Sequence, residues 1–170
     1  MRHLGLVVCG SPLAARSAEV AAAGVAAGWA VHVIATRSAL GWVDRAAVEA
    51  ATGLPVLTEQ RAAGEPKRFP VVAAVVVCPA TFNTVNKIAA GIADDYPTGF
   101  VCEALASRVP LTIVPFVGDR LWGHPAWARN LDLLAGAGVR LLGVTGPLGP
   151  VADTEAAIAG FDPGTVLSPA

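Results

Sequence analysis

The chain has 170 residues and a net charge of −1, with 54% hydrophobic and 15% charged residues. This length suits one well-buried domain rather than two, and the chain lacks the dense Lys/Arg runs that a nucleic-acid-binding protein would need. The apolar runs are shorter than the roughly 18 residues of a membrane span, and Leu4–Cys9 is too short for a signal-peptide core, which predicts a cytoplasmic protein.

Strand-like apolar runs alternate with helical patterns along the chain. The expected strands are Leu4–Cys9, Ala30–Ala35, Pro55–Leu57, Val71–Cys78, Leu111–Pro115 and Val139–Val144. The expected helices are Leu13–Ala27, Ser38–Ala51, Thr84–Asp94, Phe100–Ser107 and Ala126–Ala135. Continuous hydrophobicity in the strands indicates burial on both faces, as in a parallel sheet between helices. We therefore predict a single doubly wound α/β domain over 1–145. A Pro/Gly-rich tail with a possible short helix is predicted for 146–170, and Glu59–Arg68 is a candidate mobile loop.

The cysteines and histidines do not predict a metal site. Cys9, Cys78 and Cys102 lie in or beside apolar segments and lack the spacing of metal ligands. They are predicted to be small buried core residues in a reducing compartment. The three histidines are too scattered in the sequence to suggest a shared metal.

Two turns at strand ends carry small polar residues. After the first strand, Gly10 lets the backbone approach a ligand closely, Ser11 offers a hydroxyl, and Pro12 suits a first helical position. A helix start there would favour a phosphate, although an ordinary helix cap is an equal reading; neither an NAD nor an ATP fingerprint is present. After the second strand, Thr36–Ser38 supplies two hydroxyls and a cation at the same edge, and a helix cap is again the alternative. For Trp42, core packing is favoured over stacking on a flat ring.

A third turn, Pro79–Thr84 (PATFNT), ends the most apolar strand, where open α/β sheets bind ligands. With this motif the chain resembles the homo-oligomeric flavin-containing cysteine decarboxylases, a family of phosphopantothenoylcysteine and lanthipeptide peptidyl-cysteine decarboxylases. PATFNT corresponds to their PASANT motif, and Val85–Asp94 matches the helix that follows it. Leu121–Pro125 and Asn130–Leu134 resemble the peptidyl-cysteine branch, and the likeness covers roughly residues 4 to 144.

The resemblance implies a flavodoxin-like or Rossmann-like three-layer domain that binds FMN, assembled as a trimer or a dodecamer with FMN between subunits. By position, Gly10, Ser11 and Pro12 would hold the FMN phosphate with support from Ser38. The flavin would be lined by Ala80, Thr81, Asn83 and Thr84. In that family the oxidised flavin takes two electrons from a cysteinyl group, and the resulting thioaldehyde loses carbon dioxide to give an enethiol.

The chain departs from the family at two catalytic positions. The place of the family's active-site histidine falls on Glu65, and the place of its carboxylate-binding asparagine falls on Gly118. The family's substrate-clamping segment has no counterpart in Gly146–Ala170. A general base and a positioned hydrogen bond each contribute on the order of 10²-fold to a rate, so losing both would leave a poor decarboxylase.

Three replacements are conceivable. Glu65 could act as the base with Arg68 or Arg120 holding a carboxylate, although a solvated loop is the favoured reading of this charged run. His124 could reach the site from a neighbouring turn. A paralogous subunit could supply the missing groups.

Two functions therefore stay open. One is a flavin-dependent decarboxylase-like enzyme, a lyase or oxidoreductase with altered catalytic residues, acting on a thiol- or carboxylate-bearing peptide or small molecule. The alternative is a non-catalytic flavoprotein companion or regulatory subunit. A function like that of the related prenyl-FMN synthases is less favoured, because that group requires a different serine-rich motif. Phe82, bulkier than the family's usual alanine, could stack on the flavin, exclude a peptide tail or pack the helix start.

Overall fold

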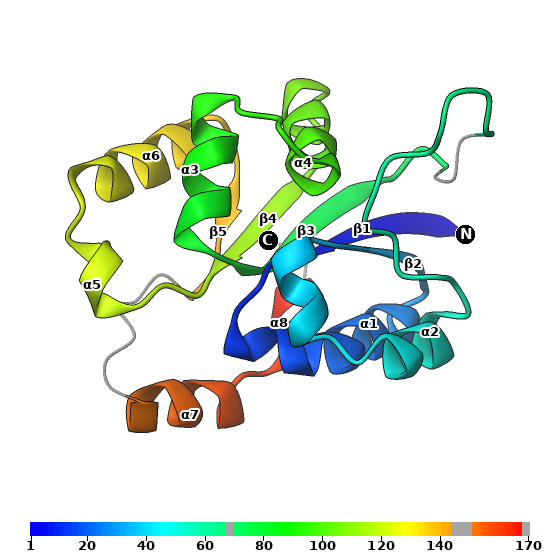
Figure 1. The fold of residues 1–170 in the computed structure, drawn as a ribbon, viewed down its shortest axis with the longest axis horizontal. Helices are drawn as coiled ribbons and strands as arrows, with labels where there is room; N and C mark the ends of the chain where they lie inside the picture. Colours follow the sequence, from blue (N-terminus) through cyan, green and yellow to red (C-terminus); the bar gives the residue numbers. More distant parts are fainter. Residues whose placement is uncertain (67–69, 144–150, 168–170) are drawn as a thin grey trace.

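The structure, a computed structural model, describes residues 1–66, 70–143 and 151–167 (Figure 1). Its described part contains one parallel sheet in the strand order β2-β1-β3-β4-β5. The strands are β1 (Arg2–Val8), β2 (Trp29–Ala35), β3 (Ala74–Ala80), β4 (Leu111–Pro115) and β5 (Arg140–Leu141). This is the flavodoxin-like order, so the predicted doubly wound α/β fold is confirmed.

Helices cover both faces of the sheet, which gives three layers (Figure 1). One face carries α1 (Ser17–Ala26), α2 (Arg45–Thr52) and α8 (Pro163–Leu167), and the other carries α3 (Phe82–Ala90), α4 (Tyr96–Ala106) and α6 (Pro125–Gly136). The shorter helices are η1 (Pro12–Arg16), η2 (Arg37–Gly41), α5 (Asp119–Trp122) and α7 (Val151–Ala159). None of the helices in the described ranges has both the length and the apolar run that crossing a bilayer requires.

Strand side chains supply both halves of the core. In β1, Leu4, Leu6 and Val8 pack toward α1, whereas Val7 packs toward the α3 and α6 face. All four are essentially inaccessible to solvent. The continuous hydrophobicity of the sequence therefore corresponds to burial on both faces, as predicted.

Several helix boundaries differ from the prediction because local capping decides them. The helix predicted over Leu13–Ala27 divides into η1 and α1, and the helix over Ser38–Ala51 divides into η2 and α2. Asp44 starts α2 by accepting a 3.0 Å hydrogen bond from Ala47 N–H. Helix α4 begins at Tyr96 instead of Phe100, since Asp95 and Thr98 form a capping box there.

The strand ends also differ. β3 begins at Ala74 rather than Val71, because Val71 belongs to the incoming connection and is 93% exposed. The predicted strand at Pro55–Leu57 is reduced to one parallel bridge between Ile34 and Leu57, at the outer edge of β2. β5 covers two residues of the strand predicted over 139–144, and Val144 lies outside the described residues.

The core assignment of Trp42 is wrong: its side chain is 48% exposed. Helix η2 ends just before it, and the neighbouring Val43 takes the buried position instead.

The described part of the C-terminal segment packs on the α1 face. Helix α8 lies there, with Val166 2% exposed in the same core cluster as Leu4 and Ala21, and α7 precedes it in the chain. Residues 146–150 and 168–170 of the predicted tail lie outside the described residues, as does Arg68.

Candidate functional site

The turns after β1, β2 and β3 meet at the carboxyl edge of the sheet. Cys9 N–H donates to the Pro79 carbonyl at 3.1 Å, and Thr36 N–H donates to the Val8 carbonyl at 2.9 Å. On the other side, Phe116 N–H donates to the Ala80 carbonyl at 2.8 Å, which adds the turn after β4. The fold thus brings together the three turns in which cofactor-binding residues were predicted.

Gly10 lies in contact with the backbone of η2. A Cβ atom at Gly10 would stand 2.6 Å from the carbonyl carbon and oxygen of Ser38 and 2.7 Å from its Oγ. Only glycine permits this approach. The Ser38 hydroxyl is itself 3.1 Å from Thr36 Oγ1, so the first two turns form one cradle of backbone and hydroxyl groups.

Ser11 supplies the clearest sign of a ligand. It is 8% exposed, and its Oγ has no hydrogen-bond partner among the described residues. Although Ser11 precedes η1, its side chain does not cap that helix, so the helix-cap reading is not what the structure shows. A buried hydroxyl without a partner costs free energy, and a phosphate oxygen beside Gly10 would satisfy it. The residues present therefore fit a phosphate group.

The third turn is ordered by two threonines. Thr81 caps α3, and its Oγ1 is 3.2 Å from Thr84 Oγ1 and 3.4 Å from Thr84 N. Ala80 and Thr84 are buried, whereas Asn83 is exposed in the first turn of α3. The small buried residues leave room beside the strand end, and the exposed Asn83 amide can form hydrogen bonds there. These features are suited to contacts with the edge of a flat polar ring such as a flavin.

Cys9 was not predicted as a site residue, yet it lies beneath this turn. It is fully buried, and hydrogen bonds from the Thr84 side chain and the Thr81 backbone reach its thiol. Burial raises the pKa of the Cys9 thiol to about 11, against the smaller opposing effect of these hydrogen bonds. The thiol is therefore neutral at physiological pH and acts as a fixed hydrogen-bonding group below α3.

The raised pKa predicts a loss of stability at alkaline pH. The folded protein holds the Cys9 proton more tightly than the unfolded chain does. The contribution of this proton to the free energy of unfolding is therefore fully present below pH 9, the ordinary pKa of the thiol, and is lost as pH rises through 11. We expect Cys9→Ala to reduce the alkaline decline in unfolding free energy by about 3 kcal/mol, because the pKa is raised by two units and each unit corresponds to about 1.4 kcal/mol. Denaturant titrations between pH 7 and 11.5 measure this. Cys102→Ala, at a half-buried position, serves as the control, and an equal effect of both variants would contradict the prediction.

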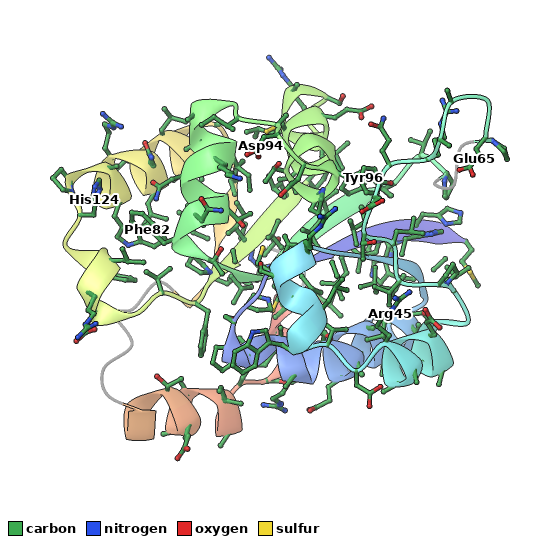
Figure 2. The ribbon with its side chains drawn as sticks, in the orientation of Figure 1. Arg45, Glu65, Phe82, Asp94, Tyr96 and His124 are labelled. Atoms are coloured by element: carbon green, nitrogen blue, oxygen red, sulfur yellow. The ribbon has the colours of Figure 1, made fainter. Side chains whose placement is uncertain are left out.

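Phe82 packs against an aromatic cluster. Its ring stacks on Trp127 and meets the edge of His124, each with centroids 5.5 Å apart, and Trp122 lies 5.6 Å from Trp127. Of the three readings of Phe82, the structure therefore shows packing at the helix start. The same contact places His124 beside the third turn (Figure 2).

His124 and Arg120 lie at this end of the molecule. The His124 Nδ1 accepts a 3.1 Å hydrogen bond from Ala126 N–H and caps α6, which leaves Nε2 to carry the proton of the neutral ring. Arg120 is exposed in α5, the helix that begins immediately after Gly118.

Glu65 lies elsewhere. Figure 2 shows it at one end of the molecule and His124 at the other. Its carboxylate accepts a 3.0 Å hydrogen bond from Ala62 N–H, and its carbonyl accepts one from the Arg61 guanidinium. Within one chain, Glu65 and the third turn are not brought together.

Known proteins agree with this geometry. The family model described as Flavoprotein matches residues 1–164. The chain belongs to the Flavoprotein family. It is 33% identical over 148 residues to the coenzyme A biosynthesis bifunctional protein CoaBC of Thermococcus kodakarensis, covering 83% of this chain and 36% of the relative. The chain spans about a third of the length of such curated relatives.

Two solved structures of FMN-dependent cysteine decarboxylases are also similar. TvaF, from thioviridamide biosynthesis, gives a TM-score of 0.73 at 27% identity, covering 94% of this chain and 96% of that one. SpaF gives 0.70 at 28% identity with the same coverage. The predicted family, fold class and flavoprotein character are confirmed, and the prediction of FMN as the cofactor agrees with these matches.

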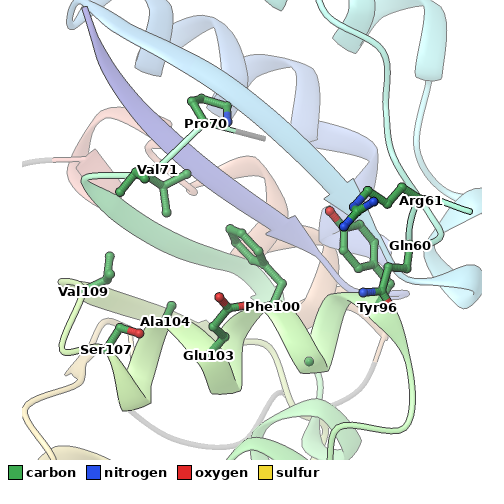
Figure 3. Close-up of a pocket in the computed structure, with 12 residues that line it drawn as sticks. Gln60, Arg61, Pro70, Val71, Tyr96, Phe100, Glu103, Ala104, Ser107 and Val109 are labelled. Atoms are coloured by element: carbon green, nitrogen blue, oxygen red, sulfur yellow. The ribbon is translucent and has the colours of Figure 1, made fainter. Parts of the chain in front are cut away.

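The flavoprotein fold also contains a hollow away from the three turns. Figure 3 shows a cavity of about 430 Å³ between α4 and the connection that carries Pro70 and Val71. A smaller hollow of about 240 Å³ lies beside Arg37 and shares Gln60 and Tyr96 with the first. Neither is lined by a predicted cofactor-binding residue.

Sequence reasoning also missed a polar pair that joins α3 to α6. Asn130 Nδ2 donates to Asn86 Oδ1 at 2.6 Å, and Asn86 Nδ2 donates to the Phe82 carbonyl at 2.8 Å. Asn130 is 7% exposed, so this link is largely shielded from water. Both asparagines lie in segments that carry the family resemblance, but their pairing depends on how the two helices cross.

Proposed function

We propose that this chain binds FMN at the carboxyl edge of its sheet and acts as a decarboxylase-like enzyme on a thiol- or carboxylate-bearing peptide or small molecule. The observation that carries the proposal is the buried, unpartnered Ser11 hydroxyl beside Gly10, at the same edge as the PATFNT turn. Membership of the Flavoprotein family and the likeness to TvaF and SpaF support it.

Each predicted residue has a place in this proposal. Gly10, Ser11 and Pro12 hold the phosphate, with the Ser38 hydroxyl beside them. The flavin is lined by Ala80, Thr81, Asn83 and Thr84. When bound, FMN supplies the two-electron oxidation that makes loss of carbon dioxide from a cysteinyl group feasible.

The protein's part in the reaction is to orient the substrate and to move protons. We assign the proton transfer to His124. Its Nδ1 accepts from Ala126 N–H, so Nε2 carries the proton of the neutral ring, and the ring itself packs against Phe82. Arg120 would hold the substrate carboxylate through its planar guanidinium group.

Glu65 can take part in the reaction only from a second copy of the chain, because within one chain it lies at the opposite end of the molecule from His124 and the third turn. The proposal therefore includes a homo-oligomer, a trimer or a dodecamer, in which one copy completes the site of its neighbour. A paralogous subunit could take the same place. A cytoplasmic location stays a prediction.

The decisive test is anaerobic mixing with a peptide that ends in cysteine. We expect the purified protein to be yellow, its flavin absorbance to bleach on mixing, and carbon dioxide to be released in step. A matched peptide ending in serine should leave the flavin oxidised. If the protein is yellow, but the cysteine peptide neither bleaches its flavin nor releases carbon dioxide, the proposed enzyme activity is contradicted. That result would favour the non-catalytic companion subunit.

A further inference from the structure

Arg16 joins two parts of the chain that are far apart in sequence. Its Nη1 donates to the Ile158 carbonyl at 2.6 Å and to the Phe161 carbonyl at 2.7 Å. The guanidinium carbon also lies 5.6 Å from the centre of the Phe161 ring. The last residue of η1 is thereby bonded to the end of α7 and to the connection between α7 and α8.

The rest of the guanidinium group is engaged as well. Nε donates to Glu19 Oε1 at 3.0 Å, and Nη2 donates to the other carboxylate oxygen. The Arg16 side chain is 21% exposed, compared with 87% for Arg37 in its surface ion pair. The planar guanidinium group donates both to the Glu19 carboxylate and to the two carbonyls, and the single ammonium group of lysine cannot reproduce this set of hydrogen bonds.

The C-terminal segment is a firm support for this contact. Val166 and Leu167 pack with the α1 face, and the Leu167 Cδ1 lies 3.6 Å from where a Cβ of Gly24 would stand. The carbonyls that accept from Arg16 are thus held by the core of the domain. Between Arg16 and Ser11, the side chains of Leu13 and Ala14 are buried, so η1 has little freedom to shift.

We propose that Arg16 is a positioning residue for the phosphate of FMN. By fastening the end of η1 to the C-terminal segment, it holds the Gly10–Pro12 turn in its cradle against Ser38. This inference rests on the proposed function, because it assumes that the phosphate lies at this turn. It predicts that the C-terminal segment contributes to cofactor affinity without touching the cofactor.

Titrations with FMN and with riboflavin, which lacks the phosphate, test the proposal in the full-length protein. We expect Arg16→Lys and Arg16→Met to weaken FMN binding about tenfold, within the usual range of coupling between sites. Riboflavin affinity should stay within about twofold of the wild type, whereas a general loss of folding would weaken both ligands. Arg45→Lys is the matched control, because Arg45 pairs with Glu49 four residues along α2 and with the Val56 carbonyl, away from the turn. Glu19→Gln separates the ion pair from the two carbonyl contacts and should leave most of the preference for FMN.

A second readout needs no variant. Coupling is reciprocal, so FMN should slow amide hydrogen exchange in 155–167 more than riboflavin does. Equal slowing by both ligands, unchanged FMN affinity in the Arg16 variants, or equal loss of FMN and riboflavin would each overturn the positioning role. A wild-type protein that binds FMN no better than riboflavin would instead overturn the proposed phosphate site, and with it this inference.

Discussion

Replacing Gly10 by alanine is expected to remove most FMN binding. The new methyl group would stand 2.6 Å from the carbonyl carbon and oxygen of Ser38. Both are backbone atoms, so the two turns must separate for the methyl group to fit. Overpacking of this kind costs about 1–3 kcal/mol, and the separation opens the cradle around Ser11. We expect FMN affinity to fall by roughly 100-fold, since about 1.4 kcal/mol corresponds to a factor of ten.

Flavin fluorescence quenching measures this affinity, and Gly41→Ala is the matched control. Gly41 lies at the end of η2, close in sequence to Ser38, and an added Cβ there would meet no described atom within 4 Å. The control should bind FMN like the wild type. If Gly10→Ala kept wild-type affinity, the phosphate would not lie at this turn.

Mixing two inactive variants is expected to restore activity if Glu65 acts from a second copy. Glu65→Gln keeps the intact FMN turn, and Gly10→Ala keeps Glu65 but loses the turn. In a mixed oligomer, an FMN site of the first chain can receive Glu65 from the second. With random assembly of equal amounts, about a quarter of the sites would contain both intact parts.

The experiment compares carbon dioxide release from the cysteine peptide by each variant and by the co-expressed pair. Glu103→Gln, which removes an exposed carboxylate on α4, is the control for loss of a negative charge. Full activity of Glu65→Gln alone would remove Glu65 from the reaction. Two inactive variants whose mixture stays inactive would contradict the exchange between copies, and would leave His124 and Arg120 as the groups to test.

The parallel sheet could be predicted from the sequence, because strands buried on both faces are continuously apolar; the strand order could not. The run Val75–Cys78 and the run Leu111–Pro115 consist of apolar residues and proline with a single threonine, and β4 has the predicted bounds. The helix starts were harder to predict, since the capping box of Asp95 and Thr98 is made of side-chain contacts, and the apolar periodicity alone does not show where such contacts form. Trp42 was misplaced because its apolar character says nothing about which side of a short turn faces the core.

The candidate site was predicted turn by turn, but its contacts were not. A glycine followed by serine suggests a phosphate, yet the close approach of Gly10 to Ser38 depends on the pairing of β1 with β2. Cys9 looked like a core residue, and its hydrogen bonds to the third turn appear only when β1 lies beside β3. The link from Arg16 to the C-terminal segment carries no motif, because the two carbonyls that accept from Arg16 are more than 140 residues away.

The direction of β1 bears on how the protein can be handled in the laboratory. Met1 is 95% exposed at the amino end of this strand, whereas Gly10 follows its carboxyl end. Seven extended residues separate the two ends, a span of about 23 Å at roughly 3.3 Å per residue. An affinity tag or a surface linker joined to Met1 would therefore stand a strand's length from the turns. A chip carrying the protein by its amino terminus would leave the carboxyl edge turned toward the solution, which suits the flavin titrations described above.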